Sequence, residues 1–118
     1  MLAEAKGIKK IIIAVGYTDL RRGIDGLAQS IHAKYDLDPY DEGTLFLFCG
    51  RRSDRIKALL WEGDGFLLLY KRLERGRFEW PRTSDEAIQL TRQQYHELMT
   101  GYNPLSPRIQ KVYPSGLG

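Results

Sequence analysis

The chain has 118 residues, of which 42% are hydrophobic and 28% are charged, and its net charge is +3. This length and composition predict one globular domain with a modest core. No apolar run reaches the roughly 18 residues of a membrane span, the N-terminus lacks the pattern of a secretory signal, and Cys49 has no second cysteine with which to pair. We therefore expect a cytoplasmic protein with no membrane partner.

The N-terminal third predicts one strand and one helix. Residues 8–15 (IKKIIIAV) alternate as in a strand, with one face made of Ile11, Ile13 and Val15. Thr18 is a favourable N-cap residue. Apolar residues then recur at helical spacing, at Leu20, Ile24, Leu27, Ile31 and Tyr35. This pattern predicts a long helix from Thr18 to near Asp36.

The rest of the chain predicts several short strands and a second helix. Strands are expected at residues 44–49, 55–62, 66–73 and 86–90, with a further short strand at 77–80. Thr91 and Gln94 form a capping box that begins a short helix, and Gly101 ends it. The predicted fold is α+β, a mostly antiparallel sheet of about four to six strands with one long helix after strand 1 and a short C-terminal helix. We expect this single domain to span 1–101, followed by a Pro/Gly-containing tail at 102–118.

The sequence Glu62-Gly63-Asp64-Gly65 predicts a hairpin with a two-residue loop, either Gly-Asp or Asp-Gly. Either loop sorts the side chains of the two strands onto the same two faces. The first face is aliphatic except for Lys71 and carries Ile56, Ala58, Leu60, Leu67, Leu69 and Leu73. The second is mixed and carries Lys57, Leu59, Trp61, Phe66, Leu68, Tyr70 and Arg72. Three interpretations of the mixed face stay open: a second core face under a helix, a platform for nucleic acid, or a self-association surface.

Basic residues are concentrated between residues 51 and 82. This stretch holds nine of the 18 Lys and Arg residues against five acids, a net charge of +4, so the rest of the chain is close to neutral. Charge of one sign on strand-like elements is typical of a surface that binds a polyanion. The candidate nucleic-acid-binding residues, including two from an earlier segment, are Arg21, Arg22, Arg51, Arg52, Arg55, Lys57, Arg72, Arg75 and Arg77.

The earlier segment, residues 16–23, joins the first strand to the predicted helix N-terminus. Backbone N–H groups at such a terminus can hold a phosphate, and Arg21 and Arg22 add bidentate donors. The alternative is a well-capped helix with two solvated arginines. The segment has no GxxxxGK[ST] pattern, which argues against a nucleotide-hydrolysing P-loop.

Antiparallel geometry predicts a cluster of arginines at one end of the sheet. The loop at residues 51–55 joins two strands, and the following hairpin returns Arg72 and Arg75 to the same end. With an Asp-Gly turn, Lys57 lies opposite Arg72, and such a like-charge pair is destabilising. Either a bound anion relieves this pair or the two long side chains splay apart.

The acidic, histidine and cysteine residues do not predict a catalytic or metal site. A two-metal centre needs several carboxylates at one strand end, whereas the acids are scattered over Asp19, Asp25, Asp54, Glu62, Asp64 and Glu74. His32, His96 and Cys49 lack the paired spacing of zinc ligands. We therefore expect no enzyme activity, no metal and no cofactor.

Three segments carry a resemblance to a known family: GYTDLRRGIDGL at 16–27, RRSDRIKALLWEGDGFLLLYKRLERGRFEWP at 51–81, and IQLTRQQYHELMTG at 88–101. The chain resembles the small TnpB-type accessory protein that bacterial insertion sequences of family number sixty-six encode beside the main transposase. It departs from that pattern at Tyr17, where proline is expected, and at Glu62, where aspartate is expected. The resemblance implies a non-enzymatic helper in DNA transposition and supplies no molecular mechanism.

Two hypotheses for the molecular role follow. The first is a DNA-binding module that uses the nine basic residues named above, mainly on phosphates. The second is a protein adaptor that docks on the cognate transposase, or on a second copy of itself, through Trp61, Tyr70, Phe78 and Trp80. Both hypotheses fit the composition, because aromatic residues and arginine are also enriched at protein interfaces.

Overall fold

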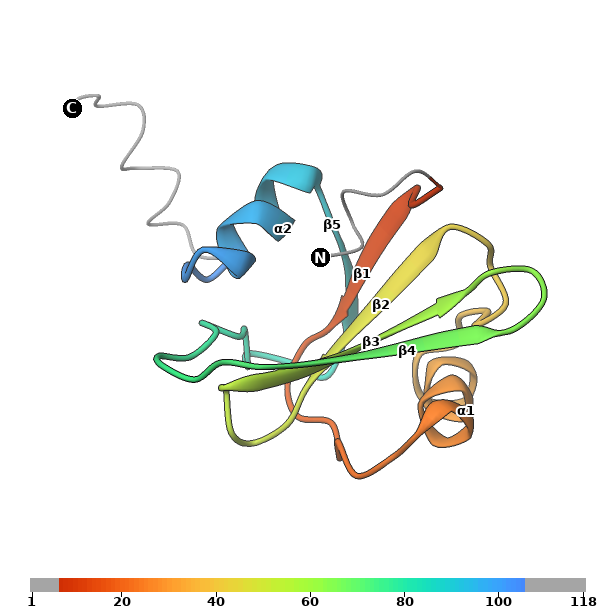
Figure 1. Ribbon diagram of the computed structural model, residues 1–118, viewed down its shortest axis with the longest axis horizontal. Helices are drawn as coiled ribbons and strands as arrows, with labels where there is room; N and C mark the ends of the chain where they lie inside the picture. The colour runs from red at the N-terminus through yellow and green to blue at the C-terminus, as the bar shows by residue number, and fades with distance from the viewer. Residues whose placement is uncertain (1–6, 106–118) are drawn as a thin grey trace.

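Five strands form one sheet in the order β4-β3-β2-β1-β5, in a computed structural model that describes residues 7–105 (Figure 1). The strands are β1 (Lys10–Ala14), β2 (Thr44–Cys49), β3 (Arg55–Trp61), β4 (Phe66–Arg72) and β5 (Ala87–Leu90). The helices are α1 (Ile24–Tyr35) and α2 (Arg92–Met99). β1 and β2 are parallel and are connected through α1, while every other pair is antiparallel. The predicted α+β class with a mostly antiparallel sheet is confirmed.

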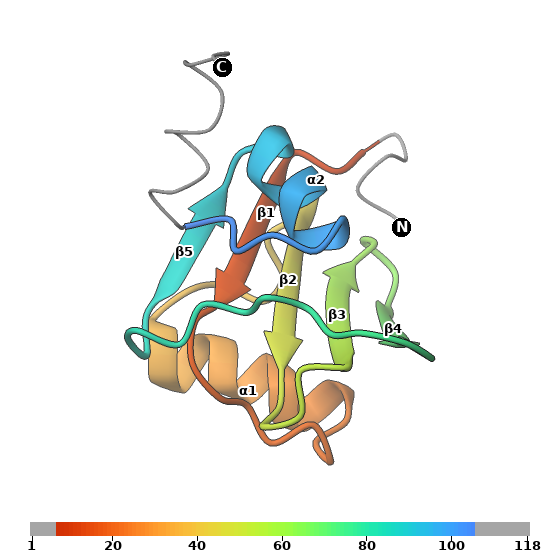
Figure 2. The same cartoon turned by 90° about the vertical axis from the view of Figure 1, so that its left-hand side faces the viewer.

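The two helices lie on opposite faces of the sheet, as Figures 1 and 2 show. On the α1 face, Leu27 and Ile31 pack with Phe46, Phe48 and Leu59 from the central strands. The larger cluster lies on the α2 face and includes the predicted row of Ile11, Ile13 and Val15. Both faces of the central strands are therefore buried, which explains why all six residues of β2 are buried.

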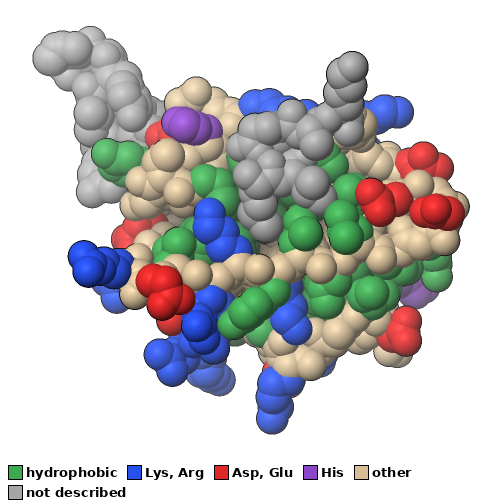
Figure 3. Space-filling model, viewed as in Figure 1, with side chains coloured by type: hydrophobic (Ala, Val, Ile, Leu, Met, Phe, Trp, Pro, Cys, Tyr) green, Lys and Arg blue, Asp and Glu red, His purple; other side chains and the backbone are tan. Residues whose placement is uncertain are grey.

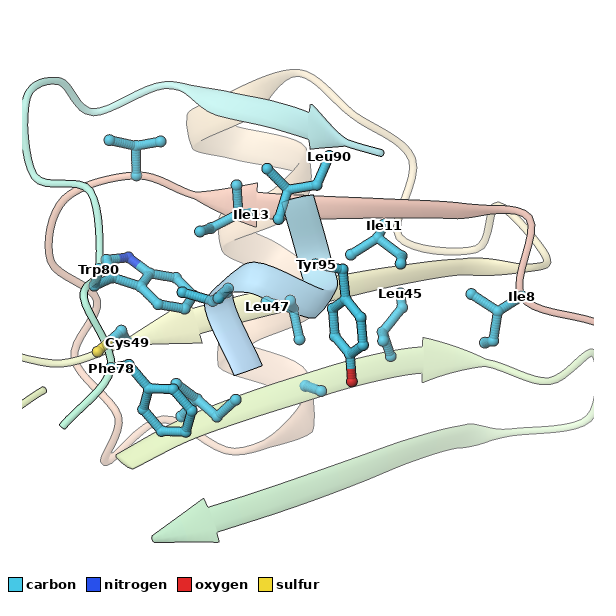
Figure 4. Packing of buried hydrophobic residues seen from close by; sticks show 14 of the residues in the cluster. Ile8, Ile11, Ile13, Leu45, Leu47, Cys49, Phe78, Trp80, Leu90 and Tyr95 are labelled. Atoms are coloured by element: carbon cyan, nitrogen blue, oxygen red, sulfur yellow. The ribbon is translucent and has the colours of Figure 1, made fainter. Parts of the chain in front are cut away.

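The segment between β4 and β5 covers part of the α2 face, where a short strand was expected at residues 77–80. It forms no strand, yet Phe78 and Trp80 are only 2% and 5% exposed (Figure 4). Trp80 Nε1 donates to the carbonyl oxygen of Ala14 at 3.0 Å, and the Phe78 N–H donates to that of Ser53 at 2.7 Å. The expectation that these two rings are interface anchors is corrected, because both close the core.

Helix α1 begins at Ile24, and the prediction that it starts at Thr18 and is long is wrong. The Thr18 N–H donates to the carbonyl oxygen of Cys49 at 2.9 Å, at the end of β2. Asp19 then closes a turn by accepting from the N–H groups of Arg21 and Arg22. These contacts hold residues 18–22 against the sheet, so the helix is 12 residues long. Its predicted end near Asp36 is confirmed, since Asp36 is the C-cap.

The β3–β4 hairpin uses Gly63-Asp64 as its two-residue loop, with the Glu62 N–H donating to the Gly65 carbonyl oxygen at 2.9 Å. Gly63 has a φ of +92°, as expected for glycine at the first central position of a type II′ turn. The register pairs Trp61 with Phe66. The predicted sorting of side chains onto two faces is confirmed, since the aliphatic set joins the cluster under α2 and the mixed set lies on the α1 side.

The loop choice decides which cations face each other across the hairpin. Lys57 lies opposite Tyr70, and Arg55 lies opposite Arg72. An Asp-Gly turn would have placed Lys57 opposite Arg72. The Gly-Asp loop instead places Arg55 opposite Arg72, so the like-charge pair consists of two arginines and lies nearer the end of the sheet.

Helix α2 begins as predicted, with a complete capping box between Thr91 and Gln94. It ends at Met99, and Gly101 follows with a φ of +104°. The first residues of the expected tail pack on the domain, since Leu105 contacts the core and the Pro104 carbonyl oxygen accepts from Gln94 Nε2 at 3.3 Å. Residues 106–118 lie outside the described part. No helix between residues 7 and 105 is long and apolar enough to cross a membrane.

Candidate nucleic-acid interface

A cavity of about 960 Å³ lies at the end of the sheet where β2 ends, β3 begins and β4 ends. Its walls come from the connection before α1, from the loop after β2, and from the two strands of the hairpin. The lining residues are Tyr17, Thr18, Asp19, Leu20, Arg21, Gly50, Arg51, Arg52, Arg55, Lys57, Leu68 and Tyr70. Three stretches of the chain, residues 17–21, 50–57 and 68–70, thus build one site.

The cavity combines cations, aromatic rings and apolar side chains. Tyr17 and Tyr70 are 50% and 52% exposed, so both rings are open to solvent while bordering the cavity. Leu20 and Leu68, which pack against the core cluster under α1, supply apolar side chains to its lining. Five of the predicted basic residues border it, namely Arg21, Arg51, Arg52, Arg55 and Lys57.

Arg82, which sequence reasoning did not single out as a site residue, ties the cavity walls together. Its guanidinium donates to the carbonyl oxygens of Gly16 at 2.7 Å and Gly50 at 2.6 Å, and to Ser53 Oγ at 3.0 Å. It also lies over the Tyr17 ring, 4.2 Å from its centroid. No local pattern could have revealed this role, because the two carbonyl acceptors lie 66 and 32 residues away in the sequence.

Two carboxylates, Asp19 and Asp54, offset part of the positive charge of the cavity. Asp19 accepts from Arg21 Nε at 3.0 Å and from its terminal nitrogen at 2.9 Å, and these hydrogen bonds lower the pKa of Asp19 to about 2. Asp54 accepts from Arg55 Nε at 3.0 Å, which lowers the pKa of Asp54. Both carboxylates are therefore ionised at neutral pH and hold Arg21 and Arg55 in defined orientations.

An aromatic ring orients Arg51, and a backbone carbonyl group orients Lys57. The Arg51 guanidinium lies 5.1 Å from the centroid of the Tyr17 ring. Lys57 Nζ donates to the carbonyl oxygen of Arg22 at 2.9 Å, which links β3 to the connection before α1. The Arg22 side chain instead donates to Ser30 Oγ on α1. Arg22 therefore does not border the cavity, and the helix N-terminus begins beyond it.

Three further predicted cations do not border the cavity. Arg72, Arg75 and Arg77 are exposed, in β4 and in the segment that follows it. Arg72 is 3.4 Å from Glu74, and Arg77 is 3.5 Å from Glu79. Figure 3 shows Lys and Arg side chains gathered at its lower left, over the ends of β3 and β4. The structure thus brings five of the nine predicted residues to the cavity and places Arg72 next to it, opposite Arg55.

The four aromatic residues predicted for a protein interface separate into three locations. Tyr70 borders the cavity, while Phe78 and Trp80 are buried. Trp61 lies at the far end of β3, where its ring centroid is 5.0 Å from that of Tyr40 and 4.9 Å from that of Phe66. The aromatic cluster Tyr40–Trp61–Phe66 is therefore a separate surface from the cavity.

Other reactive groups contribute little to the site. Cys49 is buried, as expected, and this burial raises the pKa of its thiol although Arg82 lies nearby. Among residues 7–105, no three His, Cys, Asp or Glu side chains are grouped so that they could hold a metal ion.

Comparison with known proteins matches the family described as IS66 Orf2-like protein over residues 9–108. Two proteins of Sinorhizobium fredii, both described as uncharacterized, are similar. Protein y4hO is 36% identical over 92% of this chain and 92% of its own length, and y4jC is 33% identical over 86% and 85%. No solved structure matches the chain. The chain belongs to the IS66 Orf2-like family and has an accessory role associated with transposition of an insertion sequence.

Proposed function

We propose that this accessory protein acts without catalysis and binds DNA through the cavity at the end of the sheet. One observation carries the proposal: five basic side chains and two half-exposed tyrosines from three segments border a single cavity. Arginine and lysine supply the donors that phosphate oxygens need. Arg72, opposite Arg55 on the neighbouring strand, adds an exposed cation beside the cavity, and Arg75 and Arg77 are exposed in the segment that follows β4.

The cavity cations are held in place before any ligand arrives. Arg21 and Arg55 are oriented by Asp19 and Asp54, and Arg51 lies over Tyr17. A preorganised cation loses less side-chain entropy on binding than a freely rotating one. Because Asp19 and Asp54 lie close to these cations and offset part of their charge, we expect moderate affinity for DNA. Dissociation constants should be about 10⁻⁴ to 10⁻⁶ M at physiological salt, with little sequence preference.

A salt-titrated binding experiment with fluorescent DNA tests the proposal. With about three to five phosphate contacts, log K should fall against log salt with a slope of about −3 to −4.5 on duplex. Changing Arg51 and Arg52 together to alanine should flatten this slope by about one unit for each lost contact.

Lys9→Ala combined with Lys10→Ala is the matched control, since it removes the same charge near the start of β1, at the other end of the sheet. This control should leave the slope nearly unchanged. Absence of binding at low salt by protein with a native circular dichroism spectrum contradicts the proposal, and equal effects of the two double variants contradict the location of the site.

A second candidate function is docking on the cognate transposase through the Tyr40–Trp61–Phe66 cluster. It rests on the exposure of this cluster, since Tyr40 is 56% exposed and Trp61 is partly so. Aromatic side chains in such clusters commonly dominate interface energies. Co-purification of the two proteins should then be lost with Tyr40→Ala and retained with the Arg51 and Arg52 double variant.

A further inference from the structure

We infer that the cavity takes an unpaired nucleotide, so that the ligand is single-stranded DNA with one base stacked on Tyr70. This inference rests on the proposed DNA-binding function and names the form of DNA that the site selects. The observations that carry it are the open ring of Tyr70, the two guanidinium groups packed on the ring of Tyr17, and the cavity that both tyrosines border.

Tyr70 provides an open stacking surface. It lies on β4, the edge strand of the sheet, and its side chain is 52% exposed. Within residues 7–105 no aromatic ring packs on Tyr70 and no cation lies over its face, in contrast to Tyr17, which has guanidinium carbons at 4.2 and 5.1 Å from its centroid. The phenol of Tyr70 interacts with Arg55, whose pKa is raised mainly by its hydrogen bond with Asp54 and to a lesser extent by Tyr70.

Tyr17 is a fixed wall of the cavity. Arg82, which is itself anchored on two backbone carbonyl groups, holds the Tyr17 ring from one side of the site. Leu20 and Leu68 line the same cavity as the two tyrosines and give it an apolar surface. A nucleotide base matches this arrangement, because it is planar and largely apolar and has a phosphate on either side. The faces of the base can contact the aromatic rings and the leucines, while the phosphates remain at the basic rim.

Duplex DNA does not present such a group. Its bases are stacked inside the helix and its outer surface is phosphate and sugar, so a base can stack on Tyr70 only after leaving the helix. A cavity of about 960 Å³ lies at the upper end of the roughly 300–1,000 Å³ range of small-ligand sites, which is ample for one nucleotide. Duplex can therefore contact the rim cations, and single-stranded DNA can contact both the rim and the apolar lining.

The basic rim is placed to hold the phosphates on either side of that base. Arg51 and Arg52 lie in the loop after β2, and Arg21 lies in the connection before α1, so cations flank the cavity from two segments. Stacking on an aromatic side chain together with a positively charged groove is the usual combination in proteins that bind single strands without sequence preference.

The test compares three fluorescent ligands: an oligothymidylate of about 12 nucleotides, a duplex of about 20 base pairs, and an abasic strand as long as the oligothymidylate. The wild-type protein should bind the oligothymidylate more tightly than the abasic strand, which carries the same phosphates. Tyr70→Ala should weaken oligothymidylate binding by roughly 5- to 150-fold, the range that corresponds to about 1–3 kcal/mol for a stacked base. Binding of the duplex should change by less than about twofold.

Tyr70→Phe keeps the ring and should retain most of the affinity for the oligothymidylate. Tyr40→Ala, which removes another half-exposed tyrosine at the other end of the sheet, should leave it unchanged. If oligothymidylate, abasic strand and duplex bind equally well, with Tyr70→Ala without effect on any of them, the inference is overturned and the phosphate-binding function stands. If the folded protein binds none of the three, the proposed DNA-binding function itself is overturned.

Discussion

At the scale of single residues, Arg82 determines the geometry of the cavity although it does not border it. One guanidinium holds the carbonyl oxygens of Gly16 and Gly50 and the hydroxyl of Ser53, and it packs on Tyr17. Hydrogen bonds from a charged donor are stronger than neutral ones, and their loss leaves part-buried carbonyl groups without a partner. Removal of Arg82 should therefore loosen two walls of the site at once.

We predict that Arg82→Ala lowers the free energy of unfolding by about 2–3 kcal/mol in urea denaturation. Arg82→Lys should recover only part of this loss, since a single ammonium cannot reach three acceptors as a planar guanidinium does. Arg77→Ala is the matched control: Arg77 is exposed and pairs only with Glu79 among the described residues, so the change should stay within about 0.5 kcal/mol. If Arg82→Ala and Arg77→Ala lower the free energy of unfolding equally, Arg82 does not hold the walls of the cavity together.

At the scale of elements, the β3–β4 hairpin sets the composition of the site. The Gly63-Asp64 loop places Lys57 opposite Tyr70, and so puts a cation and an open ring side by side at the cavity. A one-residue slip would move every side chain of one strand to the other face. The turn at one end of the hairpin therefore controls which side chains meet at the other end.

We predict that Gly63→Ala destabilises the protein by about 1–2 kcal/mol, because an L-residue is strained at a φ of +92°. Gly65→Ala in the same turn is the control, since its φ is not positive and an added Cβ would meet nothing within 4 Å. It should change the unfolding free energy by less than about 0.5 kcal/mol. Similar melting curves for the two variants would show that the assigned loop is wrong.

The elements differ in how far the sequence determines them. The strands at residues 44–49, 55–62 and 66–73 were predicted to within one residue because alternation and turn chemistry are local signals. The start of α1 was missed because Thr18 and Asp19 have good capping chemistry but are engaged by the sheet and by Arg21. Tertiary contacts override local propensity in this segment.

The candidate site was predicted in part for the same reason. Arg51, Arg52, Arg55 and Lys57 follow from antiparallel geometry, which the turn signals establish. The burial of Phe78 and Trp80 could not be predicted, because their segment crosses the α2 face without forming a strand. An aromatic residue beside arginines fits a core position and an interface equally well until the chain path is known.

At the scale of the whole molecule, the two ends of the sheet differ in chemistry. The end with the cavity is basic, whereas the hairpin turn at the other end carries Glu62 and Asp64 and lies beside Glu42. The seven residues of β3 separate these ends by roughly 20 Å at about 3.3 Å per residue. The proposed nucleic-acid site and the candidate docking cluster Tyr40–Trp61–Phe66 therefore do not overlap.

The assembly of the cavity from three separate stretches of the chain links ligand binding to the melting temperature. The unfolded chain has no cavity, so a ligand of the site binds the native state alone and stabilises it by mass action. At a free concentration about 100 times the dissociation constant, this linkage contributes about 2.7 kcal/mol. We predict that saturating oligonucleotide raises the melting temperature by on the order of 10 °C, and that the Arg51 and Arg52 double variant shows a much smaller shift. A thermal shift measurement can therefore rank ligands before their binding mode is known, since each increment in melting temperature reports occupancy of a site that exists only in the folded protein.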